Sequence, residues 1–165
     1  MIRIIGSEIN LRHSALEVYV SGCIRDCPGC HNPEAQAFGN GMRWDKWLTA
    51  NRYKLTTGTF RNIWILGGDL LCQPDPAEVE EFLRSFRLAM PQEMDLWLWT
   101  GADRESVPSS VLRHIDWLKT GIYLQGLPDR DVRLPDGTWL TLASGNQELE
   151  HVPHPHQERR RKDPR

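Results

Sequence analysis

The segment ALEVYVSGCIRDCPGC, residues 15–30, joins a short apolar stretch to a crowded group of cysteines. Its first part, residues 15–21, is rich in β-branched and aromatic residues, which is typical of a β-strand. The part that follows carries three thiols with the spacing C-x3-C-x2-C, at Cys23, Cys27 and Cys30. The Pro28-Gly29 pair favours a sharp turn, so that three thiolates can converge. The segment therefore predicts a strand that ends in a metal-binding or redox loop.

Beyond this loop, short strand-like runs alternate with longer amphipathic segments. We expect strands at 62–67, 95–100 and within 117–124, and helices at 44–54, from 76 to about 90 and from 107 to about 115. Pro76 suits the first position of its helix, and the acidic residues just behind it suit the helix dipole. Alternating strands and helices are the signature of right-handed βαβ units, so the fold class is α/β with a parallel sheet.

Three sequence features each follow a predicted strand. They are the cysteine group, the run Gly67-Gly68-Asp69 and the pair Thr100-Gly101. Ligands of parallel sheets bind at the carboxyl ends of the strands. We therefore expect these three features to gather at one rim of the sheet.

The pattern changes in the C-terminal part. Residues 132–142 hold Asp136-Gly137 between two short apolar stretches, which predicts a hairpin. From residue 150 the chain is rich in Pro, His, Arg and Lys, and we expect this tail to be disordered. The expected organisation is one domain over residues 1–149 and a basic tail over residues 150–165.

Composition restricts the class of protein. The chain has 165 residues, of which 39 % are hydrophobic and 25 % charged, and its formal net charge is −2. These values favour a globular cytoplasmic protein and argue against one built on phosphate contacts, so we expect no direct nucleic-acid partner. No apolar run approaches the ~20 residues of a membrane span, and the N-terminus does not resemble a secretory signal.

The cysteine group has more than one interpretation. Three crowded thiols in a reducing compartment indicate metal or redox chemistry, and thiolates are the ligands of iron–sulfur clusters. Three ligands leave one iron of a [4Fe–4S] cluster open to a substrate. A structural zinc ion is the alternative, with His31 or a tail histidine as fourth ligand, and a site without metal is a further one. The remaining thiol, Cys72, is expected to be a small buried residue and not a fourth ligand.

The cysteine spacing resembles that of the radical S-adenosylmethionine (SAM) superfamily. Within it, the stretch EVYVSGCIRDCPGCHNPEAQ resembles the activating proteins of anaerobic ribonucleotide reductase. The likeness extends over about residues 12–147. Its further motifs are LGGDLL at 66–71, LWLWTG at 96–101 and ASGNQ at 143–147.

The resemblance implies a fold, a reaction and partners. The fold is an incomplete parallel (β/α) barrel of the small radical SAM type, with four or five parallel strands. Cys23, Cys27 and Cys30 hold the [4Fe–4S] cluster, and SAM is cleaved reductively to a radical that takes hydrogen from a glycine. The partners are the large subunit of the anaerobic reductase and a reductant such as flavodoxin. The residues implied to bind SAM are Gly67, Gly68, Asp69, Thr100 and Asn146.

The chain departs from the family pattern at two places. His31 stands where the family often has tyrosine, and Lys119-Thr120-Gly121 stands where the family tends to carry an acidic residue before the glycine. Two other functions stay open at this point. One is a radical SAM enzyme that acts on a small molecule, and the other is a non-enzymatic zinc or iron–sulfur module.

Overall fold

The computed structural model describes residues 1–153, and it contains a seven-stranded sheet in the order β3-β1-β2-β4-β5-β6-β9. The strands of this sheet are β1 (Arg3–Asn10), β2 (Ala15–Val20), β3 (Met42–Arg43), β4 (Asn62–Gly67), β5 (Asp95–Trp99), β6 (Trp117–Thr120) and β9 (Glu148–His151). A separate two-stranded hairpin consists of β7 (Arg130–Arg133) and β8 (Trp139–Leu142).

The centre of the sheet is parallel, as predicted. The strands β2, β4, β5 and β6 run in one direction, whereas β1, β3 and β9 pair antiparallel at the two sides. The edge strands β3 and β9 do not pair with each other, so within residues 1–153 no barrel is closed. The fold is thus a mixed α/β structure around a largely parallel open sheet.

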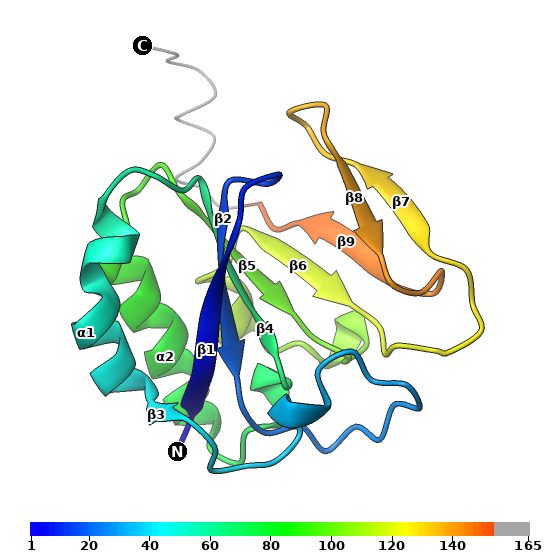
Figure 1. The fold of residues 1–165 in the computed structure, drawn as a ribbon, viewed down its shortest axis with the longest axis horizontal. Helices are drawn as coiled ribbons and strands as arrows, with labels where there is room; N and C mark the ends of the chain where they lie inside the picture. The colour runs from blue at the N-terminus through cyan, green and yellow to red at the C-terminus, as the bar shows by residue number, and fades with distance from the viewer. Residues whose placement is uncertain (154–165) are drawn as a thin grey trace.

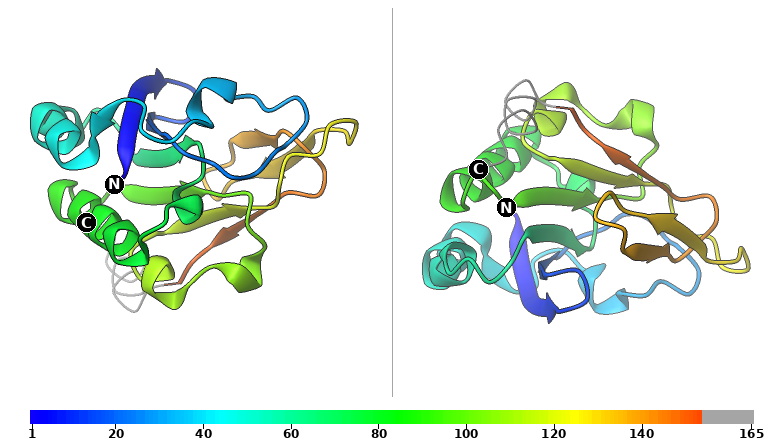
Figure 2. Two further views of the ribbon diagram at one scale, coloured as in Figure 1. Left: turned by 90° about the horizontal axis from the view of Figure 1, so that it is seen from below. Right: turned by 90° about the horizontal axis from the view of Figure 1, so that it is seen from above.

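The helices cover one face of the sheet, and the hairpin packs on the other (Figures 1 and 2). The helices are α1 (Trp44–Thr56), α2 (Pro76–Ala89) and α3 (Ser109–Leu112), with short 3-10 turns η1 (Pro33–Ala35), η2 (Leu70–Cys72) and η3 (Arg104–Ser106). Asp75 caps α2, because its side chain accepts a 3.0 Å hydrogen bond from the amide of Ala77. Pro76 stands at the predicted first turn of this helix.

Side chains of the parallel strands alternate between two apolar cores. On the helix face, Ile63, Ile65, Leu96 and Leu98 pack with Phe82, Leu83 and Phe86 of α2. On the opposite face, a tryptophan cluster packs beneath the hairpin. It consists of Trp64, Trp97, Trp99 and Trp117, with Leu134, Leu140 and Leu142 from the hairpin region. The two-sided burial explains why these strands are almost continuously apolar in sequence.

Some predicted boundaries differ from the structure. The helix expected from residue 107 is only one turn, since α3 begins after its N-cap residue Pro108 and ends before its C-cap residue Arg113. The expected domain boundary after residue 149 falls inside β9, which pairs with β6 as far as His151 and is followed by the buried Val152. The rest of the predicted tail, residues 154–165, lies outside the described residues. No helix among the described residues is long and apolar enough to cross a membrane.

Candidate metal and cofactor site

A cavity of about 220 Å³ lies at the carboxyl ends of β2, β4, β5 and β6. The three features that the sequence predicts at one rim all line it. They are Cys23, Cys27 and Cys30 after β2, Gly67-Gly68-Asp69 after β4, and Thr100-Gly101 after β5. The shared pocket confirms that the parallel strands bring these distant segments together.

Backbone hydrogen bonds fix the beginning of the cysteine loop, which we define as residues 21–32. The amide of Gly22 donates to Ala35 at 2.8 Å, and the amide of Cys23 donates to Gln36 at 3.0 Å. The buried side-chain amide of Gln73 donates to the carbonyl oxygens of Ser21 and Gly22, at 2.9 and 3.3 Å. The loop therefore leaves β2 in a defined direction.

The three thiols are partly exposed, and none of them forms a disulfide. A fourth thiol, that of Cys72, forms a hydrogen bond with Cys23. This contact and burial raise the pKa of Cys23, whereas the same contact lowers the pKa of Cys72. As the side chains stand in residues 1–153, no three Cys, His, Asp or Glu residues are gathered closely enough to hold a metal ion.

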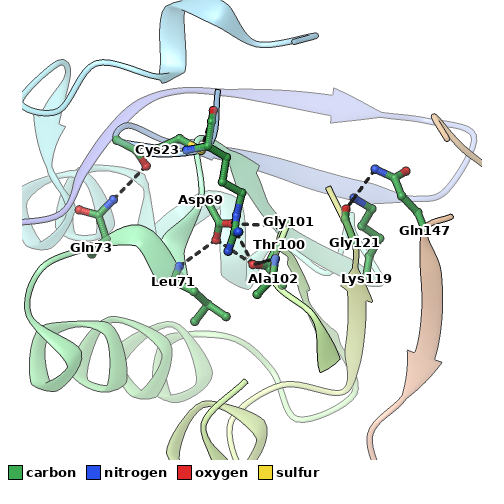
Figure 3. Close-up of polar contacts among 12 residues, drawn as sticks. Cys23, Asp69, Leu71, Gln73, Thr100, Gly101, Ala102, Lys119, Gly121 and Gln147 are labelled. Carbon is green, nitrogen blue, oxygen red and sulfur yellow. Dashed lines mark hydrogen bonds and ion pairs between the residues drawn. The ribbon is translucent and has the colours of Figure 1, made fainter. Parts of the chain in front are cut away.

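Asp69 lies at the centre of a buried polar network (Figure 3). Its carboxylate, 2 % exposed, accepts hydrogen bonds from the amides of Leu71 and Gly101, both at 2.9 Å, and from Nε of Arg25 at 2.7 Å. The hydroxyl of Thr100 lies 2.9 Å from both carboxylate oxygens. The carboxylate thus joins the cysteine loop to the ends of β4 and β5.

The Gly67-Gly68 pair lies where three segments of backbone meet. Gly67 has a φ of +107°, which is in the region that favours glycine. A Cβ on Gly68 would lie 2.7 Å from the carbonyl oxygen of Gly22 and 2.8 Å from that of Ala35. These glycines let the end of β4 approach the cysteine loop closely.

The β6 side of the cavity carries two polar side chains that lack full partners. Lys119 is 7 % exposed, and its Nζ donates to the carbonyl oxygen of Gly121 at 3.0 Å. Burial lowers the pKa of Lys119 to about 8. Gln147 is 3 % exposed, its Nε2 donates to the same carbonyl at 3.3 Å, and its Oε1 has no partner among the described residues (Figure 3).

Asn146, expected to bind SAM, does not line the cavity. Its amide nitrogen donates to the carbonyl oxygen of Ile122 at 3.0 Å, and its side-chain oxygen accepts from the hydroxyl of Ser144. These bonds hold the chain that follows β6 against the loop before β9. The neighbouring Gln147 lines the cavity in its place.

His31 also lines the cavity, and its ring lies against that of Tyr123, with centroids 4.5 Å apart. Two further residues of the site, Arg25 and Lys119, were not among the residues that the resemblance implied. The sequence signal for Arg25 was its position between two cysteines. For Lys119, the signal was the cation at the end of an otherwise apolar strand.

The residues of this cavity fit the groups that the sequence implies. Three soft thiols from one loop are the donor type of iron–sulfur clusters. Within residues 1–153, the buried amine of Lys119 forms no ion pair with a carboxylate, and Oε1 of Gln147 in the same wall has no hydrogen-bond partner. These two groups fit a polar, partly anionic small molecule.

The fold and the site together define an α/β protein with a three-cysteine cofactor pocket at the carboxyl ends of its parallel strands. The chain belongs to the 4Fe-4S single cluster domain family, whose model matches residues 12–138. It is also similar to several anaerobic ribonucleoside-triphosphate reductase-activating proteins. The protein of Escherichia coli is 25 % identical over 138 residues, which are 82 % of this chain and 86 % of that protein.

Two further relatives with the same name show similar identities. The protein of Enterobacteria phage T4 is 28 % identical over 138 residues, or 80 % of each chain. That of Vibrio cholerae is 27 % identical over 118 residues, which are 68 % of this chain and 76 % of the relative. No solved structure is significantly similar to the chain.

Proposed function

We propose that the chain is a radical SAM enzyme that activates an anaerobic ribonucleotide reductase. The observation that carries this proposal is the shared cavity of the cysteine triplet and the strand-end segments Gly67-Gly68-Asp69 and Thr100-Gly101. The family match to a 4Fe-4S domain and the names of the relatives support it. On this proposal, the open sheet is the small version of the superfamily's barrel.

Each part of the cavity has a separate task in this proposal. Cys23, Cys27 and Cys30 hold the [4Fe–4S] cluster. When bound, the cluster and SAM supply the reductive cleavage that generates a radical for hydrogen abstraction from a glycine. An electron donor such as flavodoxin is required, and the large subunit of the reductase is the partner that carries the glycine.

The chain's own groups then bind and orient SAM. The backbone at Gly67 and Gly68 lines the cavity without side chains and leaves room for a ligand. The amine of Lys119 provides a positive charge for the ligand's carboxylate, and Gln147 provides an acceptor. The hydrogen bond between Thr100 and Asp69 joins the ends of β4 and β5. The hydrogen bond from Asn146 to Ile122 fixes the chain that follows β6.

Exposed apolar side chains on the segments around the cavity support a protein partner. Ile24 in the cysteine loop is 76 % exposed, and Ile122 and Leu124 after β6 are 39 % and 38 % exposed. Ile122 also lines the cavity. Exposed apolar side chains at this rim would suit contact with another protein if the three form one patch.

Anaerobic reconstitution with iron and sulfide tests the proposal. We expect about four irons per chain, release of methionine and 5′-deoxyadenosine on reduction with SAM, and a glycyl radical signal after mixing with an anaerobic reductase. Cys27→Ala should abolish all three results, whereas Cys72→Ala should preserve them.

Three other results would contradict the proposal. One bound zinc without sulfide would indicate a structural module, and modification of a small molecule alone would indicate a different radical enzyme. Turnover that survives Cys27→Ala would show that the ligands are assigned wrongly.

A further inference from the structure

Asp69 has no free acceptor position for a ligand. A carboxylate offers about four lone-pair positions. Four donors of this chain surround that of Asp69: the amides of Leu71 and Gly101, the hydroxyl of Thr100 and Nε of Arg25. The acid of the Gly67-Gly68-Asp69 run is therefore satisfied inside the protein, and its partners indicate what it does.

Arg25 is the partner of Asp69 that comes from the cysteine loop. It stands between Cys23 and Cys27 and is the only cation between Cys23 and Cys30. Its side chain is 28 % exposed, and its Nε lies 2.7 Å from Oδ2 of Asp69. Its backbone amide lies 3.4 Å from the sulfur of Cys23. One residue thus contacts a predicted cluster ligand through its backbone and the ends of the sheet through its side chain.

Gly101 gives an independent indication that the position of Arg25 is specific. A Cβ built on Gly101 would lie 2.5 Å from Cδ of Arg25 and 2.8 Å from its Nε. The φ of Gly101 is not in the left-handed region, so the backbone alone does not require glycine here. A side chain at position 101 would instead displace the Arg25 side chain from its present position over the end of β5.

We propose that Arg25 is a positioning residue, whose guanidinium group fixes the cysteine loop to the ends of β4 and β5 through Asp69. This inference rests on the proposed function, in which the fixed loop holds its three thiols in position to bind one cluster. The ion pair is neutral overall, so it orders the loop without adding net charge next to the thiolates. Asp69 then acts on the cluster through Arg25 and not by contact with SAM.

Hydrogen–deuterium exchange of the metal-free protein tests the loop, and iron loss to a chelator tests the loaded protein. In Arg25→Gln, we expect amides of residues 23–30 to exchange about 10-fold faster, and iron to leave about 10-fold faster, because a charged hydrogen bond is lost. Arg25→Lys keeps the charge but not the planar fork, and should give intermediate values in both measurements. Asp26→Asn, an exposed neighbour in the same loop, is the matched control and should behave as the wild type.

A double-substitution cycle separates this contact from general damage. Gly101→Ala should lower the melting temperature in the wild-type background. It should have little effect in Arg25→Ala, where the colliding atoms are absent. Equal effects in both backgrounds, or wild-type exchange and iron loss in Arg25→Gln, would overturn the inference. If the wild type takes up no iron, the proposed function fails, while the exchange rates still decide whether Arg25 orders the loop.

Discussion

The ammonium group of Lys119 lies 3.0 Å from the carbonyl oxygen of Gly121, and no carboxylate in residues 1–153 forms an ion pair with it. Burial lowers the pKa of Lys119 to about 8, so the charged amine costs stability even though the negative charge of Asp69 acts in the opposite direction. In this protein the amine lines the candidate SAM cavity. The carboxylate of a bound ligand would therefore give this amine the direct ion-pair partner that the described residues do not provide.

Lys119→Gln should weaken the binding of a SAM-like ligand that carries a carboxylate. The loss of one charged hydrogen bond of about 1.5–3 kcal/mol corresponds to a roughly 10- to 150-fold rise in Kd. Calorimetry with S-adenosylhomocysteine measures this change. Methylthioadenosine, which lacks the amino-acid part, is the control ligand, and its Kd should not change. Lys119→Arg should retain most of the affinity, and equal losses for both ligands would contradict the role of the charge.

Gly68→Ala should both destabilise the fold and impair iron uptake, although Gly68 has no side chain to bind anything. The new Cβ would approach the backbone oxygens of Gly22 and Ala35 to 2.7 and 2.8 Å, and overpacking of this kind costs about 1–3 kcal/mol. Urea unfolding and iron analysis measure the two effects. Gly6→Ala is the matched control, because no atom lies within 4 Å of a Cβ built there. Unchanged stability in Gly68→Ala would show that the loop start can move freely.

The parallel half of the fold was predictable because each of its strands is buried on both faces. The runs at 62–67 and 95–99 are apolar on both faces and end at glycine or at a threonine–glycine pair, which marks their boundaries. The antiparallel strands carry a much weaker signal. In β1 only Ile4 is buried, and β9 consists of Glu148, Leu149, Glu150 and His151. Such strands are held by backbone pairing to a neighbour, which sequence patterns do not reveal.

The candidate site was likewise predictable only in part. The cysteine spacing predicted a metal-binding loop, and the strand-end rule placed three segments at one rim. The internal partners of Asp69 could not be predicted, because Arg25 acquires a role only when the fold brings residues 44 positions apart together. Similarly, nothing local in the sequence distinguishes Asn146, which braces a loop, from Gln147, which lines the cavity.

Asp75→Ala should destabilise the protein through helix α2 alone. The Asp75 side chain accepts from the amide of Ala77 at 3.0 Å, and loss of an N-cap of this type costs about 1 kcal/mol. Chemical denaturation measures the change. Asp75→Asn retains an acceptor and should be close to the wild type. Asp103→Ala is a second control, because Asp103 precedes η3 without a side-chain capping bond. A cost for Asp103→Ala as large as that for Asp75→Ala would contradict the capping role.

Asp95→Asn should stabilise the protein near neutral pH, and the gain should shrink as the pH falls. Burial and the nearby charge of Asp116 raise the pKa of Asp95 above its unfolded value. The folded state therefore binds the proton more tightly than the unfolded state does, and stability falls as the pH rises from the unfolded pKa through the folded one. Asparagine carries no charge and avoids the free-energy cost of burying an ionised carboxylate. Its side-chain oxygen can still accept the 3.1 Å hydrogen bond from Nε1 of Trp117.

Melting temperatures of Asp95→Asn and the wild type at pH 7.5 and pH 4 check this prediction, since the difference should be larger at pH 7.5. Glu81→Gln is the control of opposite sign. The hydrogen bond from Arg84 lowers the pKa of Glu81, so this ionised side chain stabilises the fold at neutral pH and loses that effect in acid. Its substitution should therefore lower the melting temperature slightly at pH 7.5 and not at pH 4. A pH-independent gain in Asp95→Asn would mean that the effect comes from packing and not from the carboxylate's charge.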